Sequence, residues 1–400
     1  MRQHWFFMRS RISNFDNIMD NILTWPYVKT CIPLFLILVI IEALWSSYRK
    51  KGWVRTNDSV SSLSCGIISQ ITNLLFKSAS LASYIWTYKH FAIFDFSNIS
   101  WQEKFLLIFI LFLVIDFAYY WLHRCAHEIN IGWAGHVVHH QSEEFNLTTA
   151  LRQSSTQWIF GQFFFLPIAA IGIPITWKLG INGLNIVYQF FIHTRAIKKL
   201  SPCIEFIFNT PSHHRVHHGR NPKYLDKNHG GTLIIWDRLF GTFQEEEEEP
   251  IYGTVKPLAT FNPIVAQLHY YLVLLKDARR APNFRDKILI WFKPPGWQPS
   301  GLPPTPQPPA VSRKNTEIFN PKNPNAKMAL GLFIAGLIGA VTILFFKWPF
   351  YILGALSISS IFLLTGAGVS NNARPDRGGI KALLKKNFKQ KFYKSESPNL

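Results

Sequence analysis

Residues 105–140 read FLLIFILFLVIDFAYYWLHRCAHEINIGWAGHVVHH, and this stretch decides the fold. Its first half is apolar from 105 to 122 and approaches the length of about 20 residues that a helix needs to cross a bilayer. Its second half carries five histidines between His123 and His140. Asp116, the one acidic residue in the apolar half, is a functional candidate because an ionisable group inside a span is costly. The stretch predicts a membrane helix that leads directly into a histidine-rich site.

The composition of the whole chain also favours a bilayer. Of the 400 residues, 48% are hydrophobic and 15% aromatic, whereas only 16% are charged, below the roughly 25% of an ordinary soluble domain. The net charge of +19 fits either nucleic-acid binding or basic loops against an anionic lipid leaflet. The long apolar runs favour the second interpretation, so we expect the lipid bilayer as a partner and no nucleic acid. The four cysteines lack the paired spacing of a disulfide framework or a zinc site.

Six further apolar runs resemble this one, and together they predict an all-α integral membrane protein with about seven transmembrane helices. The seven predicted spans cover residues 30–45, 60–86, 105–122, 158–176, 180–193, 328–346 and 348–366. The fourth and fifth runs form a pair whose second member is short enough to be re-entrant. The last two runs flank a Lys347-Trp348-Pro349 turn and predict a tight hairpin.

The distribution of lysine and arginine predicts which end of the bundle faces the cytosol, since short cytosolic loops carry excess positive charge. The basic loop at 49–55, the pair Lys198 and Lys199, and the basic tail after 370 fall on one side together with every histidine cluster. We therefore expect a multi-pass protein of the endoplasmic reticulum or a bacterial inner membrane, with its site on the cytosolic face. The basic residues before position 30 disagree with this orientation, so the side of the N-terminus stays open.

These segments divide the chain into five predicted regions. They are an N-terminal segment (1–29), a transmembrane domain that carries the histidines (30–257), a Pro-rich linker region (258–326), a C-terminal transmembrane hairpin (327–370) and a basic cytosolic tail (371–400). The linker assignment rests on the proline-rich stretch 294–309, a composition that favours an extended chain. The run of five glutamates at 245–249 is expected to be a solvated loop.

Ten of the 14 histidines lie between residues 123 and 218, in groups whose spacing suits metal binding. Residues at i, i+3 and i+4 share one face of a helix, so histidines with these spacings converge on one point. Three groups show the pattern: His123 with His127; His136 with His139 and His140; and His214 with His217 and His218. Adjacent histidines such as His139 and His140 diverge by about 100° on a helix and can serve two neighbouring ions.

The number of histidines predicts two metal ions rather than one. A catalytic zinc takes about three protein ligands, whereas this set supplies four or five to each of two ions. Imidazole suits several transition metals, but oxidation of inert C–H bonds in lipid requires an ion that activates O2, which favours iron. The predicted ligands are His123, His127, His136, His139, His140, His193, His214, His217 and His218, with His213 in reserve.

Two other classes of protein also use clustered histidines. A metal transporter would place its ligands near the bilayer midplane on broken helices, but these groups lie outside the predicted spans. A zinc hydrolase is disfavoured because the sequence has neither an HExxH motif nor a GxSxG nucleophile turn. The pattern therefore favours an oxidative enzyme that acts on a membrane lipid.

At these histidines the chain resembles the fatty acid hydroxylase / sterol desaturase superfamily of membrane di-iron enzymes. The likeness is carried by residues 116–127 (DFAYYWLHRCAH), 136–140 (HVVHH), 214–218 (HRVHH) and 236–243 (WDRLFGTF). The resemblance covers about 105–257 and implies a helical cap at the cytosolic face that holds the two iron ions.

Within this superfamily the chain is most similar to the alkylglycerol monooxygenase family, through residues 127–130, 133–136, 143–154 and 226–232. That resemblance implies O2-dependent hydroxylation of the ether-linked carbon of alkylglycerols, release of a fatty aldehyde and glycerol, and tetrahydrobiopterin as the electron donor. The family usually has an aromatic residue where this chain has His229, so His229 is left out of the predicted ligands. The rival is a sterol or fatty-acid hydroxylase or desaturase with another electron donor, which would share the metal site and differ in substrate and reductant.

Two carboxylates near the histidines are candidate members of the catalytic set. Histidines that bind a metal usually donate the second ring N–H to a carboxylate or a carbonyl. Asp116 lies two turns before His123 on the same predicted helix, and Asp237 follows the last cluster. Each could support a ligand, and each has a structural alternative, as an anchor between helices or as an ordinary turn residue.

Three further polar residues are candidates for contact with the pterin or the lipid headgroup. Glu128 directly follows a predicted ligand and could act in catalysis or bind the pterin, with an ion pair to Arg124 or Arg152 as the alternative. Arg152 and Asn146 are expected to line the cofactor or headgroup site, or to cap loops.

Overall fold

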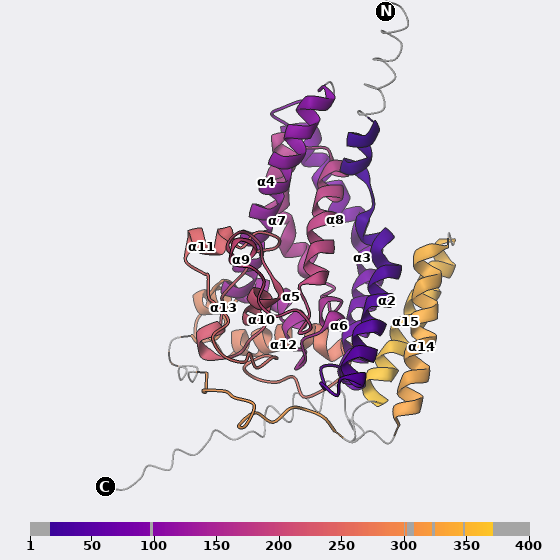
Figure 1. The fold of residues 1–400 in the computed structure, drawn as a ribbon, viewed down its shortest axis with the longest axis vertical. Coiled ribbons are helices and arrows are strands. Elements are labelled where there is room, and N and C mark those ends of the chain that lie inside the picture. Colours follow the sequence, from indigo (N-terminus) through magenta and orange to yellow (C-terminus); the bar gives the residue numbers. More distant parts are fainter. Residues whose placement is uncertain are drawn as a thin grey trace, which may run out of the picture.

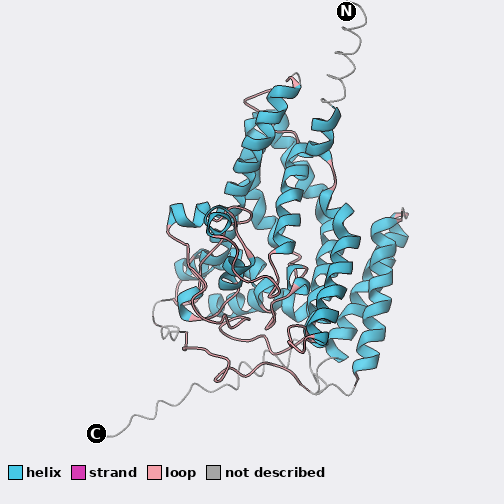
Figure 2. Ribbon diagram, in the orientation of Figure 1, coloured by secondary structure: helices cyan, strands magenta, loops and turns pink. Residues whose placement is uncertain are grey.

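The chain is built almost entirely from helices and loops in the computed structural model (Figure 2). The structure describes residues 17–96, 99–299, 301, 308–321, 325–346 and 349–370. Within these residues strand pairing is limited to two isolated bridges, Phe208 with Leu233 and Gly219 with Tyr252. The predicted all-α class is therefore confirmed. The predicted basic tail and most of the predicted N-terminal segment lie outside the described residues.

The helices form two parts, which we call the bundle and the cap. The bundle consists of α2 (Tyr27–Tyr48), α3 (Thr56–Phe91), α4 (Trp101–Glu128), α7 (Gln157–Ile171), α8 (Ile175–Phe191), α14 (Ala326–Phe345) and α15 (Phe350–Ser370). The cap consists of α5 (Asn130–His140), α6 (Leu147–Ala150), α9 (Pro202–Ile207), α10 (Pro211–His217), η1 (Pro222–Tyr224), α11 (Ile235–Phe240), α12 (Pro263–Arg280) and α13 (Phe284–Phe292). Figure 1 shows the bundle helices along the long axis and the cap gathered at their lower end.

Fewer helices than predicted have the length and composition of a membrane span. Among the described residues four qualify: α2, α4, and the segments Ala326–Ile343 and Ile352–Ser370 of α14 and α15. α3 becomes a fifth if its two parts, which meet at 54°, count as one broken span. α7 and α8 have 15 and 17 residues and reach only about 22–26 Å, against a hydrocarbon core of about 30 Å. The prediction of about seven spans is therefore too high, because α7 ends at the Gly172 turn inside the first of these two runs and α8 is itself shorter than a span.

The α7–α8 hairpin nevertheless runs along the bundle as far as the connection after α3. The main-chain amides of Ile93 and Phe94 donate to the carbonyls of Ala170 and Ile171 at the end of α7. Gly172 ends α7 with a φ of 108°, and a Cβ there would lie 2.0 Å from the Phe94 carbonyl oxygen. Only glycine satisfies both conditions at this turn. The tip of the hairpin is thus fixed at the far end of the bundle, and its open end faces the cap.

The region expected to be a Pro-rich linker contains two helices of the cap. α12 and α13 pack against α5 in one buried apolar cluster formed by Ala134, Leu274 and Ile290. The Asn130 amide at the start of α5 donates to the Ile290 carbonyl, and its oxygen accepts from the Tyr270 hydroxyl. Residues 263–280 and 284–292 are therefore helical and not an extended linker, and α12 with α13 fixes the position of α5.

The glutamate run at 245–249 crosses the cap as a strap beside α10. Glu246 is half-buried and accepts two hydrogen bonds from the Arg215 guanidinium, at 2.6 and 2.7 Å. The same guanidinium donates to the carbonyls of Thr194 and Ile197, which ties α10 to the segment after α8. The other four glutamates are exposed and form ion pairs with Lys199, Lys223 and Arg313. The expectation of a solvated loop therefore fits four of these residues and is wrong for Glu246.

Candidate metal centre

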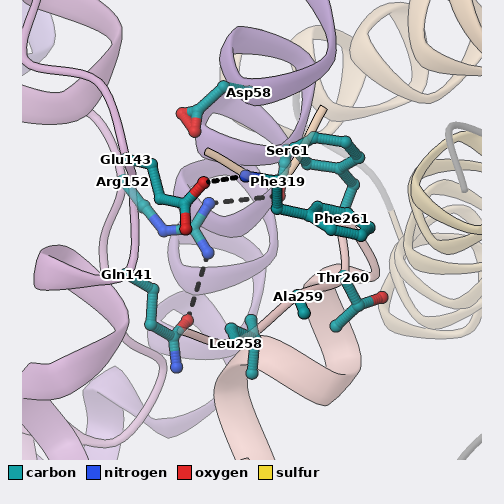
Figure 3. Close-up of a pocket in the computed structure, with 10 residues that line it drawn as sticks. All are labelled: Asp58, Ser61, Gln141, Glu143, Arg152, Leu258, Ala259, Thr260, Phe261 and Phe319. Atoms are coloured by element: carbon teal, nitrogen blue, oxygen red, sulfur yellow. Dashed lines mark hydrogen bonds between the residues drawn. The ribbon is translucent and has the colours of Figure 1, made fainter. Parts of the chain in front are cut away.

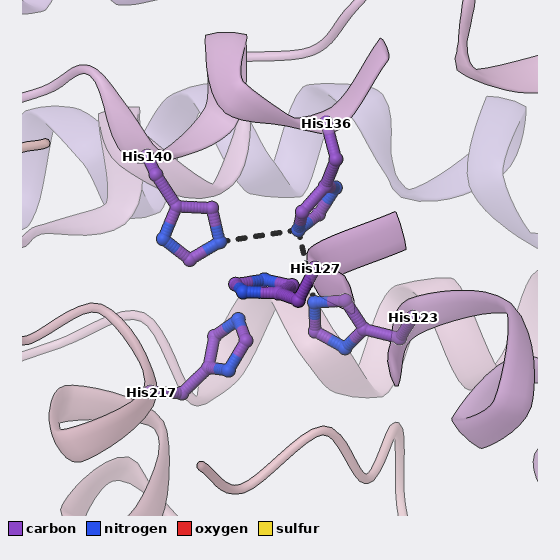
Figure 4. A group of neighbouring side chains, drawn as sticks. All are labelled: His123, His127, His136, His140 and His217. Carbon is purple, nitrogen blue, oxygen red and sulfur yellow. Dashed lines mark hydrogen bonds between the residues drawn. The ribbon is translucent and has the colours of Figure 1, made fainter. Parts of the chain in front are cut away.

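Two groups of buried histidines lie next to each other where the bundle meets the cap. Cluster one, drawn in Figure 4, consists of His123, His127, His136, His140 and His217. Cluster two consists of His139, His193, His214 and His218. Within each cluster one ligand nitrogen from every ring lies within 4.8 Å of the others. The structure thus brings together nine of the ten histidines proposed from the sequence.

The helices distribute their histidines between the clusters by their periodicity. The last two turns of α4 supply two rings to cluster one. α5 serves both clusters because adjacent side chains diverge by about 100°: His139 joins cluster two and His140 joins cluster one. At the end of α10, His217 joins cluster one and His218 joins cluster two in the same way. Of the two remaining rings of cluster two, His214 lies on α10 and His193 comes from the residues that follow α8.

Hydrogen bonds to main-chain carbonyls fix the orientation of four rings. The Nδ1–carbonyl pairs are His123 with His229, His217 with Lys227, His139 with Arg152 and His193 with Gln189, at 2.8, 2.9, 3.0 and 2.6 Å. A carbonyl only accepts, so each of these Nδ1 atoms carries a proton. The Nε2 atom of each neutral ring therefore presents a lone pair to its cluster.

These lone pairs converge within the clusters. The Nε2 atoms of His193 and His139 lie 3.2 Å apart, and neither has a proton to share. The Nε2 atoms of His127 and His217 are buried and have no hydrogen-bond partner among the described residues. Converging lone pairs repel each other unless a cation lies between them, and neutral imidazole is a common ligand of transition metals. The donor set therefore fits two metal ions, one in each cluster.

Burial lowers the pKa of seven cluster rings and so favours their uncharged form near neutral pH. It lowers the pKa of His139 to about 4, although the hydrogen bond to the Arg152 carbonyl opposes this shift. Burial first, and then the neighbouring histidines, hold the pKa well below the usual 6.5 for His136, His140, His193, His214, His217 and His218. Since a metal binds the neutral ring, these side chains need lose no proton to become ligands.

His213, the reserve ligand, joins neither cluster. Its Nε2 atom lies 2.9 Å from a carboxylate oxygen of Glu205, and its Nδ1 atom contacts the Phe208 carbonyl. It precedes His214 by one position on α10 and therefore points about 100° away from it. The geometry assigns His213 to the support of α10 and does not support its place among the ligands.

His229, which was not among the predicted ligands, lies beside cluster one. Its side chain is 0% exposed, and its ring centroid lies 5.0 Å from that of His127 and 5.7 Å from those of His123 and His217. The available signal in the sequence was that His229 is the one remaining histidine between 123 and 243. His229 was nevertheless left out of the predicted ligands, because the related family usually has an aromatic residue at this position.

Two buried carboxylates hold the loop that carries His229. The donors to Asp116 are the amides of Thr232 and Leu233, the Trp236 indole and the Asn185 side chain. The donors to Asp237 are the amides of His229 and Gly230 and the Thr242 hydroxyl. Burial raises the pKa of Asp237 to about 6, against the effect of these donors. Both carboxylates position the loop whose carbonyls orient cluster one, and they do so through the main chain.

Glu128 and Asn146, expected near the cofactor, have local partners instead. Glu128 forms an ion pair with Arg124 at 2.9 Å, and its side chain is 42% exposed. This pair is the alternative that the sequence left open. Asn146 is buried, and its side chain caps α6 by accepting from the Thr148 amide.

Arg152 supports cluster two and lines a small cavity (Figure 3). Its guanidinium donates to the Val138 carbonyl and to the side chains of Ser61 and Gln141, and its own carbonyl accepts from His139. The cavity has a volume of about 20 Å³, which holds about one water molecule. The cavity beside Arg152 is therefore too small for a pterin ring.

The chain matches known proteins over the region that contains both clusters. The family described as fatty acid hydroxylase matches residues 108–242. Alkylglycerol monooxygenase from Xenopus tropicalis is 41% identical over 307 residues, which is 76% of this chain and 67% of that protein. The proteins of the same name from Homo sapiens and Danio rerio are 43% and 42% identical over 274 residues, 68% of this chain and 60% of each relative. No solved structure matches the chain.

These alignments leave about a third or more of each relative's own length uncovered. A more distant relative, the ornithine lipid hydroxylase OlsE of Rhizobium tropici, is 31% identical over 36% of this chain and 44% of that protein. All nine clustered histidines lie inside the matched region. The identity, the coverage and the shared histidine region together show that the chain belongs to the fatty acid hydroxylase family and is similar to the alkylglycerol monooxygenases within it.

Proposed function

We propose that the protein is an O2-dependent di-iron monooxygenase that cleaves the ether bond of alkylglycerols in a membrane. One atom of O2 enters the carbon beside the ether oxygen, and the other leaves as water with two electrons and two protons from tetrahydrobiopterin. The resulting hemiacetal separates into a fatty aldehyde and glycerol. The similarity to proteins named alkylglycerol monooxygenase supports this choice of substrate.

The observation that carries the proposal is the convergence of Nε2 lone pairs in two adjacent sets. In the proposal, the five rings of cluster one hold one iron ion and the four rings of cluster two hold the other. The two clusters meet where the rings of His140 and His218 stack with centroids 4.4 Å apart. A pair of iron ions bound there supplies the activation of O2 that oxidation of a C–H bond requires.

The protein's own groups prepare this site in two ways. In four of the nine rings, main-chain carbonyls hold the proton on Nδ1 and so aim the Nε2 atom inward. None of the nine rings is more than 7% exposed, so bulk water is excluded from the place where the lipid is oxidised.

The bilayer supplies the lipid substrate and sets the orientation in this proposal. α4 carries a membrane-length apolar segment and ends in cluster one, so a lipid beside this helix lies next to the site. The loop after α2 lies at the same end of the bundle as the cap (Figure 1), and the Asn146 side chain of the cap donates to the Trp53 carbonyl in that loop. The basic residues at 49–55 therefore support a metal centre at the cytosolic face.

The test is turnover by the purified, iron-loaded full chain with an alkylglycerol, measured as fatty aldehyde. The reaction is run with and without O2 and with and without tetrahydrobiopterin. His214→Gln and His213→Gln form a matched pair, because the two histidines are neighbours on α10 and only His214 belongs to a cluster. We expect aldehyde only with O2 and the pterin, near-complete loss in His214→Gln, and retained activity in His213→Gln.

Two outcomes would overturn parts of the proposal. If the wild-type protein binds two iron ions and forms no aldehyde, ether cleavage is wrong and sterols and fatty acids become the next substrates to assay. If the wild-type protein binds no iron under anaerobic loading, the oxidative chemistry itself is wrong.

A further inference from the structure

His229 occupies a tightly held position at the edge of cluster one. Its carbonyl accepts a hydrogen bond from Nδ1 of His123 at 2.8 Å, and its amide donates to Asp237 at 2.7 Å. The two preceding positions that bend this loop, Asp226 and Asn228, have φ values of 54° and 58°. Residues in this left-handed region are uncommon outside glycine, so the surrounding contacts hold the loop in one conformation. The main chain therefore fixes where the His229 ring can lie.

The His229 ring has the spacing of a cluster member toward three of the five rings of cluster one. Two imidazoles on one ion, with metal–nitrogen bonds of about 2.1 Å, place their ring centroids on the order of 4.5–6.5 Å apart. The measured separations between members of cluster one run from 4.4 to 6.5 Å. His229 lies 5.0 Å from His127 and 5.7 Å from His123 and His217. It faces the cluster from the side of these three rings.

The nitrogens of this ring have no other use among the described residues. Both ring nitrogens are buried without a hydrogen-bond partner, and the side chain is 0% exposed. The main chain of Asp226 lies close enough to favour a proton on the ring, but neither nitrogen completes a hydrogen bond with it. Burying two polar atoms without partners is unfavourable, and a benzene or phenol ring would fill the same space at lower cost. A metal ion bound to one of these ring nitrogens would remove this cost and would account for a histidine at this position.

We propose that His229 is an additional metal-binding residue of cluster one, which supplies a sixth imidazole nitrogen to the ion held there. The proposal rests on the two-metal part of the proposed function and extends it. With His229, six histidines would hold an ion in cluster one, whereas four would hold an ion in cluster two. An ion in cluster one would then be held more firmly, and an ion in cluster two would have fewer protein ligands and be the one open to small molecules.

The test compares His229→Phe with the wild-type full chain by metal binding alone. His229→Phe keeps a ring of similar size and removes both nitrogens. Trp133→Phe is the matched control, because Trp133 also packs beside cluster one, 4.9 Å from His127, and offers no ligand nitrogen. Each protein is stripped of metal and titrated with Fe²⁺ without O2, and the iron-loaded forms are compared by X-ray absorption. Lipid and pterin are absent from all of these measurements.

We expect the wild-type protein and Trp133→Phe to bind two iron ions with equal affinity. His229→Phe should hold one of the two about tenfold or more weakly, and its X-ray absorption should show fewer imidazole nitrogens per iron. His229→Gln, which keeps a polar group, should show the same loss, and unfolding of the metal-free forms checks that all variants fold. Two equally tight ions and an unchanged spectrum in His229→Phe would overturn the inference. A wild-type protein that binds no iron would instead overturn the proposed function.

Discussion

Cluster one and cluster two differ in what supports their histidine rings. A single short loop, residues 226–229, supplies the Nδ1 partners of three rings of cluster one. The Nδ1 atoms of His123, His217 and His127 contact the His229 carbonyl, the Lys227 carbonyl and the Asp226 carboxylate respectively. In cluster two, the supports are the carbonyls of Arg152 and Gln189, which belong to the connection before α7 and to α8. Cluster one thus depends on one loop, and cluster two on two separate segments.

The loop 226–229 is itself fixed from several sides. Asn228 is fully buried and donates to the carbonyls of His213 and Gln244. Asp237 holds the amide of His229, and Asp116 holds the chain that follows. This difference in support shows that the metal centre consists of two half-sites. They share α5 and α10, but separate segments hold their rings. Substitutions can therefore be aimed at one half, and the size of their effect should follow how close they lie to a ring.

The largest effects should come from removing one ring from either half. His136→Ala in cluster one and His193→Ala in cluster two should each lower turnover by at least about 100-fold, more than the cost expected for an outer support. The reason is that oxidation needs both ions, so the loss of either half stops the reaction. Aldehyde formation under saturating O2 measures the effect, with His269→Ala in α12 as the remote control. Substantial turnover in either variant would show that the reaction does not need both clusters.

Substitutions in the supports should weaken one half selectively. Asp237→Asn loses an acceptor for the loop amides and should reduce metal affinity in cluster one by about 10–100-fold. Arg152→Lys cannot keep all the hydrogen bonds of the guanidinium and should reduce affinity in cluster two instead. Dialysis against a chelator removes the weakly bound iron. Iron analysis and X-ray absorption then show which of the two ions each variant has lost. If both variants lose the same ion, the supports are not separate.

The buried, neutral rings also predict how the metal-free protein responds to acid. The unfolded chain takes up protons on its histidines below about pH 6.5, whereas His139 stays neutral until about pH 4. The native state therefore binds fewer protons, and the free energy of unfolding should fall as the pH falls from 6.5 to 4. His139 alone accounts for about 3 kcal/mol, at about 1.4 kcal/mol per pKa unit. Denaturant unfolding at a series of pH values measures this, and a flat profile over that range would contradict the buried neutral state.

The smallest effects should come from the strap beside α10, the helix that both halves share. Glu246→Gln removes the charge that holds Arg215 and should lower the free energy of unfolding by about 1 kcal/mol. Glu247→Gln is the matched control, because its ion pair with Lys223 is exposed and such pairs contribute between about 0 and 1 kcal/mol. Thermal unfolding of the metal-free protein gives the difference. Equal unfolding temperatures for both variants would show that the strap does not support α10.

Helical periodicity was sufficient to predict eight of the nine clustered histidines because the information is local, whereas the lone His193 was predicted from its position at the end of the fifth apolar run. Spacings of three and four residues place side chains on one face, and adjacent residues diverge, which accounts for the separation of His139 from His140. The same spacing ranked His214 above His213, but the contact of His213 with Glu205 could not be predicted from it. His229 was left out because the related family usually has an aromatic residue there, and the contact that brings its loop to His123 joins residues 106 positions apart, which no local pattern reveals.

Composition predicted a helical membrane protein but not the ends of its helices. The apolar run at 158–176 contains the turn at Gly172, so α7 ends inside it, and α8 begins before the run at 180–193 and ends two residues short of its last position. α12 and α13 lie in the region expected to be a linker. That expectation rested on the proline-rich stretch 294–309 and did not take the apolar faces of these two helices into account. Their position depends on packing against α5, which no local pattern reveals.

The central claim is that each cluster holds one metal ion. The most direct test is the iron content per chain of the wild-type protein beside His140→Ala and His218→Ala, two stacked neighbours that belong to different clusters. We predict two iron ions in the wild-type protein and one in each variant, with X-ray absorption showing that the variants retain different ions. One iron ion or none in the wild-type protein, or the same remaining ion in both variants, would contradict the claim.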